Sequence, residues 1–432
     1  MLVLAVAIAA AAYAASASSK TQKLTGPAAV SGTVTFDGVW TGSEATAFGQ
    51  VIKAFNKVYP NVKIKYNPLG NNETTVLATA ITGGNPPDMA DIAQPGYVNQ
   101  LVQQGKLKPI TYAKGVISQN FAPSWLQIGT FSNKLYALVF KASNKSLFWY
   151  NVPAFKAAGV TPPKTFAQLL TTAKTLLASG TPAYSIGGAD GWTLTDLFEN
   201  IYLRTFGAAK YDQLTAHKIK WTDPSVITAL KTMAKILGDT SNIAGGTSGA
   251  LQYGFNDSVT NAFGSPPKAA IVFEADFVSG VILSSTKAKA GTGFNVAPFP
   301  SITPGPDASA VEISGDLFVT FRDNPAIEAF VKFLATAPAA NAWAKEGGFA
   351  TGNHNVNLAD YPDAIDKANQ EAVRTAKSAV FDMSDAQPAS FGSTTGQGEW
   401  GIFQTFLKSP SNVTGVAKQL ETAAAAAYKK GK

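Results

Sequence analysis

The chain has 432 residues, of which 46% are hydrophobic and only 15% are charged, against roughly 25% in an average soluble protein. This composition excludes a largely disordered chain, and the length allows about two or three domains. With no cysteine and only two histidines, disulfides, thiolate metal sites and multi-histidine metal centres are excluded. The net charge of +7 comes from scattered lysines, whereas a nucleic-acid-binding protein would gather them in a stripe.

The N-terminus begins with an unbroken run of apolar or small residues over positions 2–15. That run is shorter than the roughly 20 residues of a membrane-spanning helix, and Ala15-Ser16-Ala17 offers the small-x-small pattern of a cleavage site. We predict a signal peptide over residues 1–17, which lacks the usual basic start, and a flexible leader over 18–31. The protein is therefore expected to be exported to the periplasm or another extracytoplasmic space, with an uncleaved membrane tether as the alternative.

Strands and helices alternate in the first quarter of the chain. Alternating apolar residues predict strands over 33–36 and 62–66, and an apolar run predicts a third over 88–93. Helical spacing predicts a helix over 43–59 with Ser43 as its N-cap, and a further helix over 73–82. This order is typical of an α/β layer with a mainly parallel sheet.

The middle and the end of the chain are richer in predicted helix. Thr165, Asp223-Pro224 and Asn324-Pro325 are good helix starts. The predicted helices cover 165–180, 223–238, 324–335, 338–345, 361–377 and 412–428, and predicted strands cover 269–273 and 312–321. No repeat or long linker interrupts the chain, which favours two lobes built from alternating segments and joined by several crossings. Such a hinge would restrict motion to opening and closing.

Two stretches of the chain carry a family resemblance. The residues from Gly83 read GGNPPDMADIAQPGYVNQLVQQGKLKPI, and those from Lys134 read KLYALVFKASNKSLFWYNVPAFKAAGV. The stretch from Gly83 resembles the turn, strand and ligand-facing loop of family 1 extracellular solute-binding proteins, and the stretch from Lys134 resembles their first interlobe crossing. The segments KASNKSLFWYN and WAKEGGFATGNHNVNLADYPD resemble the α-glucoside-binding branch of that family.

The resemblance implies an α/β fold of the two-lobed, periplasmic-binding-protein type (type II, maltose-binding-protein-like) with a multi-strand hinge. Lobe 1 is expected to comprise residues 32–140 and 313–372, and lobe 2 residues 141–312 and 373–432. The implied function is that of an ABC importer's substrate-binding protein, which captures an α-glucoside or other small oligosaccharide by cleft closure and delivers it to the permease transmembrane subunits. We expect a monomer with no cofactor and no nucleic-acid partner. The chain lacks a P-loop, so the ATPase must be another chain.

A sugar pocket needs aromatic faces and side chains that both donate and accept hydrogen bonds. The resemblance places Trp40, Thr41 and Glu44 at the start of the first long helix, facing the cleft. It places Gln94 at the end of the third strand and Lys141 at the first crossing. The alternatives are an ordinary helix cap with Trp40 in the core, a plain turn at Gln94, and a hinge ion pair at Lys141.

In the second half of the chain, relatives place stacking aromatics at the positions of Trp192 and Trp400, which each begin a predicted helix. Core packing is the alternative for both. The remaining candidates follow or lie within predicted strands: Glu274, Asp276, Gly315 and Asp316. In the family, the segment at Glu274 carries a stacking tryptophan, and this chain departs from that pattern.

A role in presenting ligand to a membrane sensor stays open beside import, because both would use the closed lobes. Two other function classes compete with transport. A secreted glycosidase needs two carboxylates about 5 Å or more apart around the scissile bond, and Glu274, Asp276, Asp316 or Glu399 could supply them. Carboxylates also bind sugar hydroxyls without chemistry, so we expect no enzymatic activity. A carrier of polyamines or metal ions would need clustered acidic, Tyr or His side chains, and the positive charge balance with two histidines favours neither.

Overall fold

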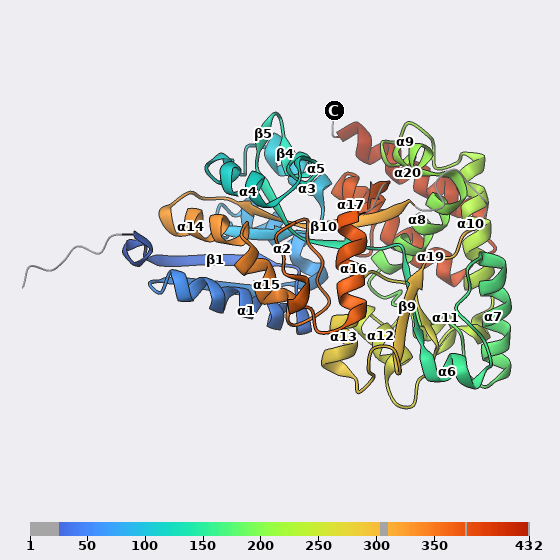
Figure 1. The fold of residues 1–432 in the computed structure, drawn as a ribbon. Helices are drawn as coiled ribbons and strands as arrows, with labels where there is room; N and C mark the ends of the chain where they lie inside the picture. Colours follow the sequence, from blue (N-terminus) through green and yellow to red (C-terminus); the bar gives the residue numbers. More distant parts are fainter. Residues whose placement is uncertain (1–25, 303–309, 376–377, 431–432) are drawn as a thin grey trace, which may run out of the picture.

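The computed structural model describes residues 26–302, 310–375 and 378–430, which form two bodies side by side (Figure 1). The predicted signal peptide and most of the predicted leader lie outside these residues. The leader's end is described and forms a short 3-10 turn at Gly26–Ala29. Within the described ranges, no helix combines the length and the apolar character needed to cross a bilayer.

Lobe 1 is built on a six-stranded sheet whose order is β11-β10-β3-β1-β2, with β6 also paired to β10. Its strands are β1 Gly32–Gly38, β2 Val62–Pro68, β3 Met89–Ile92, β6 Ala137–Asn144, β10 Val311–Thr320 and β11 Ala379–Phe381. Strand β1 runs parallel to β2 and β3, as the strand–helix order predicts. Val34 and Phe36 of β1 alternate into the core, where Phe36 contacts Phe48, Phe318 and Phe330.

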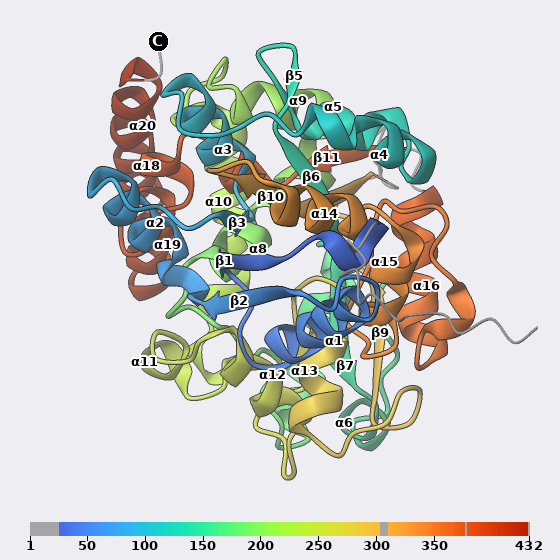
Figure 2. The same cartoon turned by 90° about the vertical axis from the view of Figure 1, so that its left-hand side faces the viewer.

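The helices of lobe 1 come from both ends of the chain. They are α1 Gly42–Val58, α2 Glu73–Thr82, α3 Pro95–Gln103, α4 Lys114–Asn120, α5 Pro123–Ile128, α14 Pro325–Leu334, α15 Ala337–Ala344 and α16 Ala364–Thr375. A small hairpin, β4 Thr130–Phe131 with β5 Lys134–Leu135, follows α5. Helices α1 and α15 are far apart in sequence but lie side by side, which Figure 2 shows from the lobe 1 side.

Lobe 2 contains a three-stranded sheet of order β8-β7-β9, made of β7 Leu147–Asn151, β8 Ile271–Val272 and β9 Phe294–Pro298. Both pairings are antiparallel, in contrast to the parallel pairing of β1 with β2 and β3 in lobe 1. The reason lies in the connections. Strands β8 and β9 are joined through a helix and run parallel to each other, whereas β7 enters between them from the other lobe and runs in the opposite direction.

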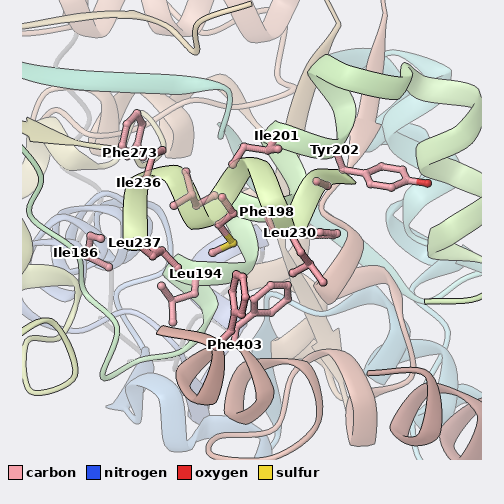
Figure 3. Packing of buried hydrophobic residues seen from close by; sticks show 14 of the residues in the cluster. Ile186, Leu194, Phe198, Ile201, Tyr202, Leu230, Ile236, Leu237, Phe273 and Phe403 are labelled. Atoms are coloured by element: carbon pink, nitrogen blue, oxygen red, sulfur yellow. The ribbon is translucent and has the colours of Figure 1, made fainter. Parts of the chain in front are cut away.

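The core of lobe 2 is formed mostly by helices, with α8 at its centre (Figure 3). Phe198 of α8 packs against Trp221 and Phe403, and every residue of α8 from Thr193 to Arg204 is buried. The lobe 2 helices are α6 Val152–Ala157, α7 Phe166–Ala178, α8 Trp192–Phe206, α9 Ala208–Thr215, α10 Pro224–Leu237, α11 Gly246–Ala250, α12 Phe255–Phe263, α13 Val278–Ser285, α17 Met383–Ala386, α18 Ala389–Gly392, α19 Gly398–Lys408 and α20 Val413–Lys430.

Two long antiparallel strands, β6 and β10, join the lobes, and a third connection leads from β11 to α17. The ladder places Asp316 opposite Lys141 and Ile313 opposite Asn144, with an irregularity between Asp316 and Leu317. The lobe boundaries predicted at 140/141 and 312/313 fall inside these strands, and the one at 372/373 falls inside α16. The boundaries themselves stay predictions.

Three of the predicted helix starts are confirmed, because the side chains of Thr165, Asp223 and Asn324 each accept a backbone N–H of the first turn. The N-cap predicted at Ser43 is wrong. Helix α1 begins at Gly42 after Thr41, whose side chain makes no capping bond. The side chain at the N-cap position of α1 therefore accepts none of the first N–H groups of this helix.

The cap of α14 gives a test of the fold. Asn324 Oδ1 accepts the N–H groups of Ala326 at 2.9 Å and Ile327 at 3.0 Å. Asn324→Ala removes this acceptor and should lower the free energy of unfolding by about 1 kcal/mol, measured by urea denaturation. Asn324→Asp is the matched control, because it keeps a capping oxygen and should stay close to the wild type. Equal losses in both variants would contradict this account of the cap.

Candidate ligand-binding cleft

A cleft of about 620 Å³ lies between the lobes, within the range of roughly 300–1,000 Å³ common for small-molecule sites. Lobe 1 lines it with the start of α1, the turn Gly70–Asn72 and the end of β3, and lobe 2 with the starts of α8, α12 and α19. The crossing strands lie between these walls. Of the predicted site residues, eight line the cleft: Trp40, Thr41, Glu44, Gln94, Lys141, Trp192, Asp316 and Trp400.

Lys141 is the charged centre of the lobe 1 side. Its Nζ lies 3.2 Å from Glu44 Oε1 and 3.4 Å from Asp316 Oδ2, and the side chain is only 4% exposed. Burial alone would lower the pKa of this ammonium, but the carboxylates of Asp316 and Glu44 outweigh burial and hold the pKa above its ordinary value. Lys141 therefore stays charged. It forms an ion pair with Asp316 across the crossing strands, and it also lines the cleft.

Trp40 belongs to the lobe 1 core and reaches the cleft with one edge. Its ring packs against Trp343, with centroids 4.6 Å apart, and the residue is 1% exposed. Its Nε1–H donates to Asp316 Oδ2 at 2.7 Å. The indole ring of Trp40 is therefore part of the lobe 1 core, and its N–H holds in place the Asp316 carboxylate that faces Lys141.

An aromatic wall, defined here as Trp192, Phe255 and Phe277, forms the lobe 2 side. The ring centroids of Trp192 and Phe255 are 5.4 Å apart, those of Phe255 and Phe277 are 5.1 Å apart, and those of Trp192 and Phe277 are 6.1 Å apart. Only Trp192 was among the predicted site residues. The sequence at Phe255 has the same feature as the sequence at Trp192: a glycine directly precedes an aromatic residue that begins a helix.

Trp400 adjoins the aromatic wall at the start of α19. It is 5% exposed, and in the described part of the chain its indole N–H has no acceptor. Gly191 has φ +83°, and a Cβ at Gly191 would lie 2.7 Å from the Cβ of Trp400. Glycine at this position therefore lets the start of α8 approach Trp400 closely.

Lys145, which was not among the predicted site residues, also lines the cleft. Its Nζ lies 3.0 Å from Asp196, contacts Asp382, and sits 5.4 Å from the centroid of the Trp192 ring. Burial would lower the pKa of Lys145, but Asp196 and Asp382 outweigh it and raise the pKa. The sequence signal that could have identified Lys145 was its position, four residues after Lys141 in the same crossing segment.

Three predicted site residues lie outside the cleft lining. Asp276 is buried and accepts the N–H of Asn144 at 3.1 Å. Glu274 is buried beside Asp196, and burial together with Asp196 raises its pKa well above the ordinary value. Gly315 lies on β10, where a Cβ would come within 2.6 Å of Val139. None of these three residues therefore faces the cleft directly.

Among the described residues, Asp196, Glu199 and Asp382 are close enough together to share a cation. Lys145 already contacts Asp196 and Asp382. Glu199 accepts the backbone N–H groups of Met383 and Ser384, at 2.5 Å and 3.1 Å. These carboxylates therefore have protein partners, and their arrangement serves the packing of α8 against α17.

Asp276 gives the site a testable pH dependence. Burial raises its pKa to about 6, above the value of roughly 3.9 expected in the unfolded chain, although Lys141 opposes the shift. The folded protein thus binds this proton more tightly, and the stability contributed by Asp276 falls as pH rises from about 4 to 6. Asp276→Asn, which keeps an acceptor for Asn144, should gain about 2 kcal/mol relative to the wild type between pH 4 and pH 7 in urea denaturation. A difference that does not change with pH would contradict this assignment.

The comparisons with known proteins agree with this geometry. The profile of bacterial extracellular solute-binding proteins matches residues 41–341. The osmoprotective compounds-binding protein GgtB of Synechocystis is 28% identical over 84% of this chain and 86% of its own length. The α-glucosides-binding periplasmic protein AglE of Rhizobium meliloti is 30% identical over 83% of this chain and 81% of its own.

Solved structures share the fold. The bacterial solute receptor AcbH has a TM-score of 0.80 at 18% identity, covering 93% of this chain and 99% of its own. A chitin oligosaccharide binding protein has a TM-score of 0.78 at 19% identity, covering 92% of this chain and 99% of its own. This chain therefore belongs to the bacterial extracellular solute-binding proteins and has their two-lobed type II fold, with the cleft between the lobes.

Proposed function

We propose that this protein captures an α-glucoside or another small oligosaccharide in the cleft and, on closure, delivers it to the transmembrane subunits of an ABC importer. The observation that carries the proposal is the pairing of an aromatic wall on lobe 2 with a polar, charged wall on lobe 1. Sugar rings have apolar C–H faces and hydroxyl edges, and such a cleft offers a surface for each.

The proposed roles follow from position. Trp192 and Trp400 would stack on sugar rings, together with Phe255. Glu44 and Asp316 would accept hydroxyl protons, and Lys141 would donate. The side chains of Thr41 and Gln94 would add polar contacts at the lobe 1 edge. Trp40, Glu274, Asp276 and Gly315 would act indirectly, by fixing the groups that face the ligand.

The names of related proteins support a carbohydrate. AglE is described as α-glucosides-binding. More distant relatives are an arabinooligosaccharide-binding protein of Bacillus subtilis and a multiple sugar-binding protein of Streptococcus mutans. None of these names describes a polyamine-binding or a metal-binding protein.

Binding without chemistry is part of the proposal. Glu44 and Asp316 both contact the ammonium of Lys141, at 3.2 Å and 3.4 Å, so each already has a protein partner in the cleft. An inverting or retaining glycosidase would need one carboxyl to be a proton donor. We further propose that the protein acts outside the cytoplasm as a monomer, without a nucleic-acid partner.

Tryptophan fluorescence and calorimetry test the ligand class. A panel including maltose, trehalose and sucrose should shift the emission and give 1:1 binding. Trp192→Ala should weaken binding about tenfold or more, since stacking on an aromatic ring is lost. Trp125→Phe is the control, because Trp125 lies on α5 outside the cleft lining, and it should leave the affinity unchanged. Silence across a broad carbohydrate panel, with binding of putrescine or a metal ion, would rule out the carbohydrate.

A further inference from the structure

The two lysines that line the cleft are each held between two carboxylates. Lys141 lies between Glu44 and Asp316, and Lys145 between Asp196 and Asp382. An ammonium shared by two carboxylates has no excess positive charge to offer an anionic ligand. The cationic side chains of the cleft are therefore occupied by the protein itself.

Three more carboxylates line the cleft and make no ion pair among the described residues. Asp190 accepts the N–H of Phe255 at 2.6 Å, and Asp257 accepts the N–H of Gly254 at 3.2 Å. Asp385 accepts Nε2 of Gln94 at 3.1 Å, and burial together with the neighbouring Asp382 raises its pKa well above the ordinary value. With Glu44 and Asp316 the lining holds five carboxyl groups against two ammonium groups, and Asp196 and Asp382 stand directly behind Lys145.

Asp190 and Asp257 stand next to the aromatic wall. Asp190 comes two residues before Trp192, and Asp257 lies in the first turn of α12, which begins with Phe255. The faces of aromatic rings carry negative electrostatic potential and attract cations. The aromatic rings and the two carboxylates would therefore both attract a cationic ligand group placed between them, and both would repel an anionic one.

We propose that the cleft selects its saccharide by charge: it binds neutral sugars and sugars with a basic amino group, it rejects uronates and other acidic sugars, and Asp190 with Asp257 sets this selection. The inference rests on the proposed carbohydrate function and adds the class of sugar. An acidic group would enter a cleft whose lining has more carboxyl groups than ammonium groups, and each charged carboxylate among them would repel it. A neutral hydroxyl meets no such penalty, and an ammonium is attracted.

Matched ligand series test the proposal by calorimetry. Each series compares one disaccharide (maltose, trehalose or sucrose) with its 6-amino-6-deoxy form and its uronic acid form, at pH 7 and low salt. The acidic form should bind about tenfold more weakly, or worse, than the neutral parent, and the amino form should bind at least about as tightly. Raising the salt concentration should reduce the difference in affinity between the acidic form and its neutral parent, because salt screens the repulsion between charges.

Variants locate the effect. Asp190→Asn and Asp257→Asn, singly and together, should reduce the penalty on the acidic form by about threefold or more. Asp212→Asn removes the same charge from an exposed position on α9, outside the cleft lining, and should leave the penalty unchanged.

The outcomes separate the two proposals. An acidic form that binds as tightly as its neutral parent would overturn charge selection while leaving the carbohydrate function standing. A penalty that persists unchanged in the double variant would overturn the role of Asp190 and Asp257. Failure of every compound to bind would remove the proposed carbohydrate function, and the charge selection with it.

Discussion

The ion pair between Lys141 and Asp316 ties the crossing strands to the cleft. The two residues face each other across the β6–β10 ladder, and Glu44 at the start of α1 completes the set. Trp40 holds the same Asp316 carboxylate from the lobe 1 core, and Phe277 of lobe 2 lies under the ammonium, 4.8 Å away. Both lobes and the hinge thus meet at one buried cation. A buried ammonium without such partners would be strongly destabilising, which fixes the geometry around it.

A further layer of polar groups supports the lobe 2 wall. Lys145 contacts Asp196 and Asp382, and Glu274 lies beside Asp196 with its pKa well above the ordinary value because of burial and the neighbouring carboxyl. A protonated Glu274 can donate to Asp196, so the cluster needs fewer counter-charges than its carboxyl count indicates. Trp192 rests against this layer through Lys145. The aromatic wall is therefore backed by fixed side chains rather than by loose loops.

The local signals in the sequence predicted much of the fold. Caps at Thr165, Asp223 and Asn324 and the alternation around β1 depend on nearby residues, which are readable from the chain alone. The antiparallel sheet of lobe 2 was missed because strand direction depends on where β7 enters from the other lobe. Polar residues of the site were harder to place: Glu274 and Asp276 follow a strand as expected but lie behind the cleft. Lys145 directly follows the crossing strand β6, and Phe255 begins α12. That both residues reach the cleft is decided by tertiary packing, which periodicity does not encode.

The most direct test of this account is a crystal structure of the protein with a bound saccharide from the panel. The account predicts closed lobes with the sugar between the aromatic wall and the Glu44–Lys141–Asp316 group, and with hydroxyls rather than acidic groups facing Asp190 and Asp257. A sugar bound elsewhere on the protein, for example in the groove between α2, α3 and α20, would contradict it.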